Sequence, residues 1–253
     1  MGLTPACNRI LFRFAANIIL VFILTGSTHA SELILSSENL NETLKQMQRI
    51  RQDMENAEPA ARADGMYKLG IMANDLAAIL SEEVALYDSQ QGGLIQLGLD
   101  RTGELGMDLI WIPEKKRFIY DGKFFGEYLQ LAPDGPHAAD SAFFSLQTEF
   151  VRVVADDPAA VQLAADHKND YLKKYPEHEN AAEVSLLLAI DYRDLWRLNR
   201  SDADKEARYR KMTLNQFRQV IDQYPGAKQA RVAQGLQVRF ESELQNSADA
   251  AGQ

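Results

Sequence analysis

The chain has 253 residues, and its 36 acids outnumber its 27 lysines and arginines, which gives a formal net charge of -9. Because the bases are outnumbered and interleaved with acids, we expect no nucleic-acid partner. The only cysteine, Cys7, lies near the amino terminus, which excludes structural cysteine clusters for zinc or iron–sulfur.

Residues 1–30 have the pattern of a secretory signal peptide. Arg9 and Arg13 precede an apolar run over 14–24, which is shorter than the roughly 20 residues that a membrane-spanning helix needs. We therefore expect a periplasmic protein, cleaved before Ser31; the alternative is an uncleaved membrane anchor. Cleavage would remove both arginines and no acid, so the net charge would change from -9 to -11.

Residues 31–91 predict a pair of antiparallel helices. The first covers 36–56, with Ser36 or Ser37 as its N-cap, and the second begins near Pro59. Each has apolar residues three and four apart: Leu40, Leu44, Met47, Ile50 and Met54 in the first, and Met66, Leu69, Ala73, Leu76, Leu80, Val84 and Tyr87 in the second. We interpret these stripes as core; a surface for a hydrophobic ligand is the alternative.

Residues 92–122 depart from this helical pattern, because seven of the 15 glycines lie between Gly92 and Gly126. A helix can still form over 94–105. The segments 108–113 and 117–122 are rich in β-branched and aromatic residues, so they predict either a short β-hairpin or an irregular, extended connector.

Trp111, Tyr120 and Asp121 are the candidate binding residues of this region, because aromatic and charged side chains in segments of low helical order often bind ligands. With them the protein would bind a cell-wall glycan. The alternative is that the aromatic rings only cover the open end of the neighbouring helices.

Three similar segments follow in residues 123–245, centred on Pro133, Pro176 and Pro225, at spacings of 43 and 49 residues. Aliphatic or aromatic residues stand five and four positions before each proline: Tyr128 and Leu129, Tyr171 and Leu172, Val220 and Ile221. Mostly small residues stand five and eight positions after it: Ala138 and Ser141, Ala181 and Val184, Ala230 and Ala233. This pattern predicts repeated helix-turn-helix units whose small residues let two helices approach closely.

The expected helices of this region lie close together in sequence, so neighbours should run antiparallel. We expect Asp157 to cap one of them and Ser201 with Asp204 to cap another, and we expect a disordered tail over 246–253. The helices cover 123–132, 138–154, 158–175, 180–198, 202–224 and 227–244.

The segments from Tyr171 to Pro176 (YLKKYP) and from Phe217 to Gly226 (FRQVIDQYPG), each with an alanine five residues after its proline, resemble the repeats of periplasmic tetratricopeptide proteins. The resemblance covers about residues 124–240. It implies an all-α fold, a solenoid of antiparallel helical hairpins. It also implies a non-enzymatic adaptor that binds an envelope protein or peptide and meets the membrane only through that partner.

Tyr192, Arg193, Trp196 and Arg197 are the second group of candidate partner-binding residues. Tryptophan, tyrosine and arginine dominate the energetics of protein interfaces. A tyrosine and a tryptophan four residues apart on one helix equally suit contact with the next helix, flanked by solvated arginines.

The chain carries none of the common catalytic, phosphate-binding or dinucleotide-binding motifs, and its histidines lack metal-ligand spacing. We therefore expect no catalytic, cofactor-binding or metal-binding residue. An enzyme with dispersed catalytic carboxylates is the remaining alternative.

Overall fold

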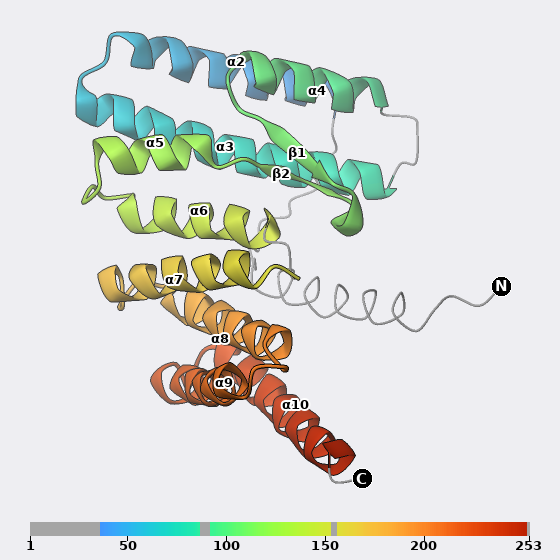
Figure 1. Cartoon of the computed structure of the whole chain (residues 1–253). Coiled ribbons are helices and arrows are strands. Elements are labelled where there is room, and N and C mark those ends of the chain that lie inside the picture. The colour runs from blue at the N-terminus through green and yellow to red at the C-terminus, as the bar shows by residue number, and fades with distance from the viewer. Residues whose placement is uncertain (1–35, 87–91, 153–155, 252–253) are drawn as a thin grey trace, which may run out of the picture. The chain divides into compact units, whose positions relative to one another are not determined.

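The computed structural model of the chain describes residues 36–86, 92–152 and 156–251. Over these residues the fold is all-α, as the sequence predicts, with nine α-helices and one two-stranded sheet (Figure 1). No helix in the described ranges is both long and apolar enough to cross a membrane. The predicted signal peptide lies outside the described residues.

The described residues form two compact units, one ending at Ser141 and the other beginning at Ala142. The sequence pattern predicts boundaries near residues 92 and 123. The segments on both sides of those positions belong to the first unit, because strand β2 and helix α5 both pack against α3.

The first unit begins with α2 (Ser37–Glu55) and α3 (Pro59–Leu86), which pack against each other. Ser36 is the N-cap of α2, since its hydroxyl accepts a hydrogen bond from the backbone N of Asn39 at 3.1 Å. The predicted stripes are largely interior: Leu40, Leu44, Met47, Met54, Met66, Leu69, Ala73, Leu76 and Leu80 are all buried, while Ile50 and Val84 are half-buried. The core interpretation of the methionines is therefore confirmed, while Tyr87 lies outside the described residues.

A helix, α4 (Gly92–Glu104), and a β-hairpin follow. The strands β1 (Leu109–Ile112) and β2 (Arg117–Tyr120) are antiparallel, with Trp111 opposite Phe118. A single 3₁₀ turn joins them, and it ends at Lys116 in the left-handed region with φ 47°. Of the two alternatives for residues 92–122, the hairpin is thus correct and the irregular connector is not.

Two contacts fix the hairpin and α5 (Lys123–Leu131) onto α3. The backbone N of Phe118 donates a hydrogen bond to the hydroxyl of Ser81 at 2.7 Å. The ring of Phe125 lies over Gly70, where an added Cβ would be 2.7 Å from the ring. Only glycine at this position lets α5 pack so close to α3.

The second unit contains most of α6 (Ala138–Arg152) and all of α7 (Pro158–Lys174), α8 (Ala181–Leu198), α9 (Ala203–Gln223) and α10 (Lys228–Ala251). Helix α8 is central, because α7, α9 and α10 all contact it and every residue from 181 to 192 is buried. A helix that is buried on all sides must accommodate its polar residues in the interior.

Two local predictions for this unit differ from the structure. The N-cap of α9 is Asp202, whose carboxylate accepts from Lys205 N at 3.1 Å, rather than the predicted pair of Ser201 and Asp204. Helix α10 continues to Ala251, although we predicted a disordered tail from residue 246. Proline is absent from 246–251 and three of these six residues are alanine, so nothing local ends the helix earlier.

The three proline-centred turns share one backbone hydrogen-bond pattern. The residue before each proline donates its N–H to the carbonyl oxygen four positions earlier: Ala132 to Tyr128, Tyr175 to Tyr171, and Tyr224 to Val220. Its carbonyl oxygen accepts from the second residue after the proline: Gly135, His178 and Ala227. The carbonyl oxygen of that residue accepts from the alanine three positions on: Ala138, Ala181 and Ala230.

The same sequence positions are buried in every copy. This holds for the position five before each proline (Tyr128, Tyr171, Val220) and for the positions five and eight after it (Ala138, Ser141, Ala181, Val184, Ala230, Ala233). The predicted turns and these packing positions are therefore confirmed at all three sites, whereas the position four before each proline is only half-buried: Leu129, Leu172 and Ile221.

Candidate functional site

Tyr192 and Trp196, the aromatic pair that the sequence singled out on α8, lie in the interior with 6% and 2% exposure. The Tyr192 hydroxyl accepts from Asn169 Nδ2 at 2.8 Å, and burial raises the pKa of this tyrosine. Trp196 Nε1 donates to Glu206 Oε1 at 2.6 Å, and the indole meets the ring of Phe240 edge to face at 4.9 Å. Both side chains therefore join α8 to its neighbouring helices. Of the two interpretations of this pair, the structure agrees with contact between helices.

The two arginines that follow them in sequence, Arg193 and Arg197, are half-buried. Arg197 Nη2 lies 2.8 Å from Glu243 Oε1 on α10, while Arg193 Nη2 lies 3.9 Å from Asp194 Oδ1. Arg200, one turn further on, covers the Trp196 ring at 4.5 Å. An external partner would have to displace the Arg197 contact in order to use that guanidinium.

The candidate residues of the hairpin are divided between core and surface. Tyr120 is 1% exposed, its hydroxyl accepts from Phe124 N at 2.7 Å, and burial raises its pKa. Asp121 is half-buried, and its carboxylate accepts from Lys123 N at 3.0 Å at the start of α5. Trp111 is also half-buried, with its ring 4.9 Å from that of Phe118.

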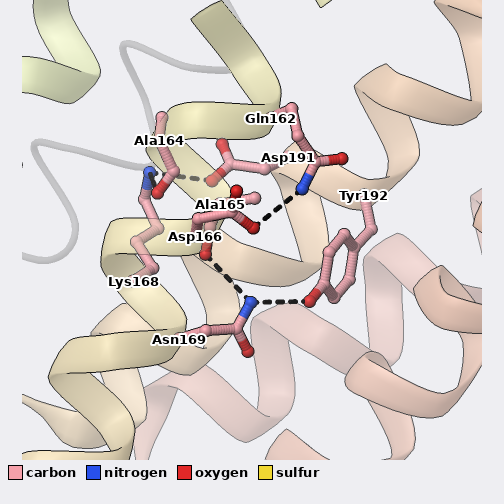
Figure 2. A network of polar contacts seen from close by, with 8 residues as sticks. All are labelled: Gln162, Ala164, Ala165, Asp166, Lys168, Asn169, Asp191 and Tyr192. Carbon is pink, nitrogen blue, oxygen red and sulfur yellow. Dashed lines mark hydrogen bonds and ion pairs between the residues drawn. The ribbon is translucent and has the colours of Figure 1, made fainter. Parts of the chain in front are cut away.

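A buried ion pair that no sequence pattern predicted joins α7 to α8 (Figure 2). Lys168 Nζ lies 2.7 Å from Asp191 Oδ2, and the two side chains are 0% and 8% exposed. Lys168 also donates to the carbonyl oxygen of Ala164 at 3.3 Å. Lys168 shares one face of α7 with the buried residues Val161, Ala164 and Tyr171. A charged residue within such an apolar stripe is the sequence signal that could have indicated a buried ion pair.

Hydrogen bonds extend this network along α7 and onward to α9. Asn169 Nδ2 donates to the carbonyl oxygen of Ala165 at 3.0 Å as well as to Tyr192 (Figure 2). Gln162 Nε2 donates to Asp166 Oδ1 at 2.9 Å, and its Oε1 accepts from the Tyr209 hydroxyl at 2.8 Å. The network thus connects three consecutive helices through their side chains.

A second set of polar groups on α8 lies nearer its amino end. Glu183 is 7% exposed and accepts from Gln147 Nε2 at 3.4 Å. Burial raises its pKa to about 6, and the Gln147 hydrogen bond and the charge of Lys228 oppose that rise. Ser185 accepts from Gln216 Nε2 at 2.8 Å in the interior.

Lys168, Asp191 and Glu183 are enclosed between helices, so none of these three presents a nucleophile or a general base to a substrate, whereas Asp166 is exposed. The hydrogen bonds of the network fix the rotation of each helix against the next, because a shift would leave buried polar groups unsatisfied. The network is therefore a device for positioning helices.

One partly exposed titratable cluster lies in the first unit, where His137 precedes α6. Its ring stacks on Tyr67 with centroids 4.0 Å apart, and its Nε2 lies 3.6 Å from Asp64 Oδ1. Lys68 Nζ lies 2.6 Å from the other oxygen of the same carboxylate. The cluster holds the turn between α5 and α6 against α3.

In the described parts of the chain, no group of three or more His, Cys, Asp or Glu could hold a metal ion. No protein-family model matches the chain, and no curated protein is similar enough to match it.

Proposed function

We propose that this protein is an exported, non-enzymatic scaffold of the bacterial cell envelope that binds an envelope protein or peptide. The observation that carries the proposal is the repeated turn. Three copies of one hydrogen-bond pattern, at Pro133, Pro176 and Pro225, each reverse the chain between two helices. Helical hairpins repeated in this way are a common means of building surfaces for other proteins.

The use of the ionisable groups supports a non-enzymatic role. Lys168, Asp191 and Glu183 are enclosed and committed to contacts between helices. Catalysis needs titratable groups that converge on a space open to substrate. Export is supported by the residues of 1–30 alone, which lie outside the described residues.

Burial in the hairpin weighs against a cell-wall glycan as the ligand. Glycan binding by Trp111, Tyr120 and Asp121 needs all three side chains at one surface. Tyr120 is 1% exposed and its hydroxyl already bonds to Phe124 N, so it cannot contact a sugar without unfolding the hairpin.

Site-specific photo-crosslinking in bacterial cells tests the proposal. A benzophenone amino acid replaces one exposed residue at a time, Gln48 on α2, His167 on α7 or Gln219 on α9. We expect a discrete protein adduct from at least one position, and the purified adduct partner should bind the purified protein in solution. The same probe at buried Tyr171 is the control, since it should give no adduct.

The absence of an adduct at all three exposed positions would contradict a scaffold role. Export is tested separately by fractionating the cells and sequencing the amino terminus of the product. A mature chain beginning at Ser31 in the periplasmic fraction supports export, and an intact chain in the cytoplasmic fraction contradicts it.

A further inference from the structure

The last helical hairpin, α9 with α10, concentrates positive charge in an acidic protein. In its central part, residues 207–240, there are seven bases and one acid, Asp222, a net charge of +6 in a chain of net -9. The outer ends of the two helices are acidic, so α9 and α10 together hold eight bases and six acids, a net charge of +2. The seven central bases are Arg208, Arg210, Lys211, Arg218, Lys228, Arg231 and Arg239. We call this set the hairpin bases.

The hairpin bases face solvent. Lys228 is half-buried and the other six are exposed. None of the seven forms an ion pair with a carboxylate in the described part of the chain, whereas Lys68, Lys173 and Arg197 each do. Apart from Lys228, whose charge acts on the nearby Glu183 carboxyl, these bases are therefore not paired with acids within the described part of the protein.

Helical spacing gathers six of the seven bases into one stripe on each helix, while Arg210 lies outside the stripe of α9. Arg208, Lys211 and Arg218 lie within about 80° of one another around α9, and Lys228, Arg231 and Arg239 do so around α10. Along α9 the stripe covers ten residues, which is about 15 Å at the rise of an α-helix. An extended peptide of about five residues has the same length.

An array of unpaired bases fits an anionic partner, and two features of the hairpin indicate which kind. Insertion into an anionic membrane surface requires exposed apolar side chains, and Val238 is the one exposed large hydrophobic residue described on α9 and α10. Binding of single-stranded nucleic acid requires exposed rings on which bases stack. The rings of α9 and α10, Tyr209, Phe217 and Phe240, are all buried.

Five of the seven hairpin bases are arginines, whose planar guanidinium can bond both oxygens of one carboxylate. We propose that the solvent-facing stripes of α9 and α10 bind an acidic segment, rich in Asp and Glu, of a partner protein. This inference rests on the proposed function, because it names the class of partner that the scaffold recognises.

The test measures binding of a fluorescein-labelled oligoglutamate peptide to the purified protein by fluorescence anisotropy. We expect binding at low salt that weakens as salt is raised, and no binding of a matched oligolysine peptide. Replacing Arg208, Lys211 and Arg218 together by Glu should weaken the affinity by about tenfold or more. All three residues are exposed, so the variant should fold normally, which its thermal unfolding checks.

The matched control replaces three exposed bases of the first unit, Arg49, Arg62 and Lys116, by Glu. It changes the net charge by the same amount, so a specific surface predicts that it binds the peptide almost as well as the unmodified protein does. Equal losses in the two triple variants, or no oligoglutamate binding at low salt, would overturn the proposal.

Two further arms test other occupants. Binding of phosphatidylglycerol vesicles or of single-stranded DNA that depends on the hairpin bases, without peptide binding, would assign the surface to lipid or nucleic acid and overturn the inference. So would salt-sensitive self-association of the protein that only the α9 variant abolishes. If crosslinked protein adducts form in cells but persist in the α9 variant, this inference fails while the proposed function stands.

Discussion

Lys168 Nζ and Asp191 Oδ2 lie 2.7 Å apart where α7 packs on α8, and both side chains are almost entirely enclosed. A charge buried in this way depends on its partner, because water cannot replace it. Removing one member leaves the other uncompensated, which costs more than the pair itself contributes.

Asp191→Asn should therefore lower the free energy of unfolding by about 3–5 kcal/mol, measured in urea. The control is Asp170→Asn, which breaks an exposed ion pair of similar length with Lys173 on α7 and should change stability little. Replacing both buried partners, with Lys168→Met and Asp191→Leu, should cost less than Asp191→Asn alone. Equal effects of Asp191→Asn and Asp170→Asn would mean that the pair is not buried in solution.

The stability of the second unit should depend on pH through Glu183. Burial raises the pKa of this carboxyl from 4.5 to about 6, so the folded protein holds the proton more tightly than the unfolded chain does. The stabilisation is complete below pH 4.5 and is lost as the pH rises through about 6. Glu183→Gln should thus raise the free energy of unfolding by up to about 2 kcal/mol above neutral pH.

Near pH 4.5 the same substitution should have little effect, since Glu183 is then protonated in the folded protein. Urea unfolding at the two pH values measures the difference. Glu179→Gln, at an exposed position of the preceding turn, is the control and should show no such pH dependence. A Glu183→Gln effect of the same size at both pH values would rule out this titration.

The alanines after the prolines should not tolerate larger side chains. Ala181 and Ala230 are 0% and 5% exposed, and leucine at either position would overpack the hairpin by three carbon atoms. Each substitution should cost about 1–3 kcal/mol in thermal or urea unfolding. Ala207→Leu, at an exposed position of α9, should leave the transition unchanged. Unaltered unfolding of both core variants would show that these alanines do not contact a facing helix.

The glycines of two turns should respond differently to alanine. At Gly135 an added Cβ would lie 2.4 Å from the hydroxyl of Tyr128, whereas at Gly226 it would meet nothing within 4 Å. Gly135→Ala should cost about 1–3 kcal/mol, while Gly226→Ala should be neutral or slightly stabilising. The midpoint of urea unfolding measures the stability change in both variants.

Tyr128→Phe should relieve part of the Gly135→Ala effect, because it removes the atom with which the new methyl group collides. It also removes the hydroxyl that accepts from His137 N at 3.0 Å, so it should itself cost about 1 kcal/mol. A double-mutant cycle separates the two contributions. Strict additivity would show that the hydroxyl is not the obstacle.

The turns could be predicted because their signals are local. Pro133, Pro176 and Pro225 end one helix in each case, and the small residues that follow identify the packing face of the next. The β-hairpin stayed one of two alternatives because its reversal depends on Lys116 in the left-handed region. Lysine gives no local sign of that conformation.

The candidate site could be predicted less well, because burial depends on residues far away in sequence. Trp196 looked suitable for an interface until Glu206 and Phe240 were seen to enclose it from two other helices. The burial of Lys168 could not be predicted, since its partner Asp191 is 23 positions away on the next helix. The hairpin bases could have been found from the window 207–240, which holds a single acid.

The hydrogen bond from Phe118 N to Ser81 affects more than the placement of the hairpin. In a sheet of two strands, the outer edge of each strand is a template on which another chain can add a strand and begin to aggregate. On β2 a serine side chain of α3 occupies the donor that an incoming strand would need at its centre. Because α3 covers this edge, Ser81→Ala should leave Phe118 N without its partner rather than open the edge, and it should lower the free energy of unfolding in urea by about 1–3 kcal/mol.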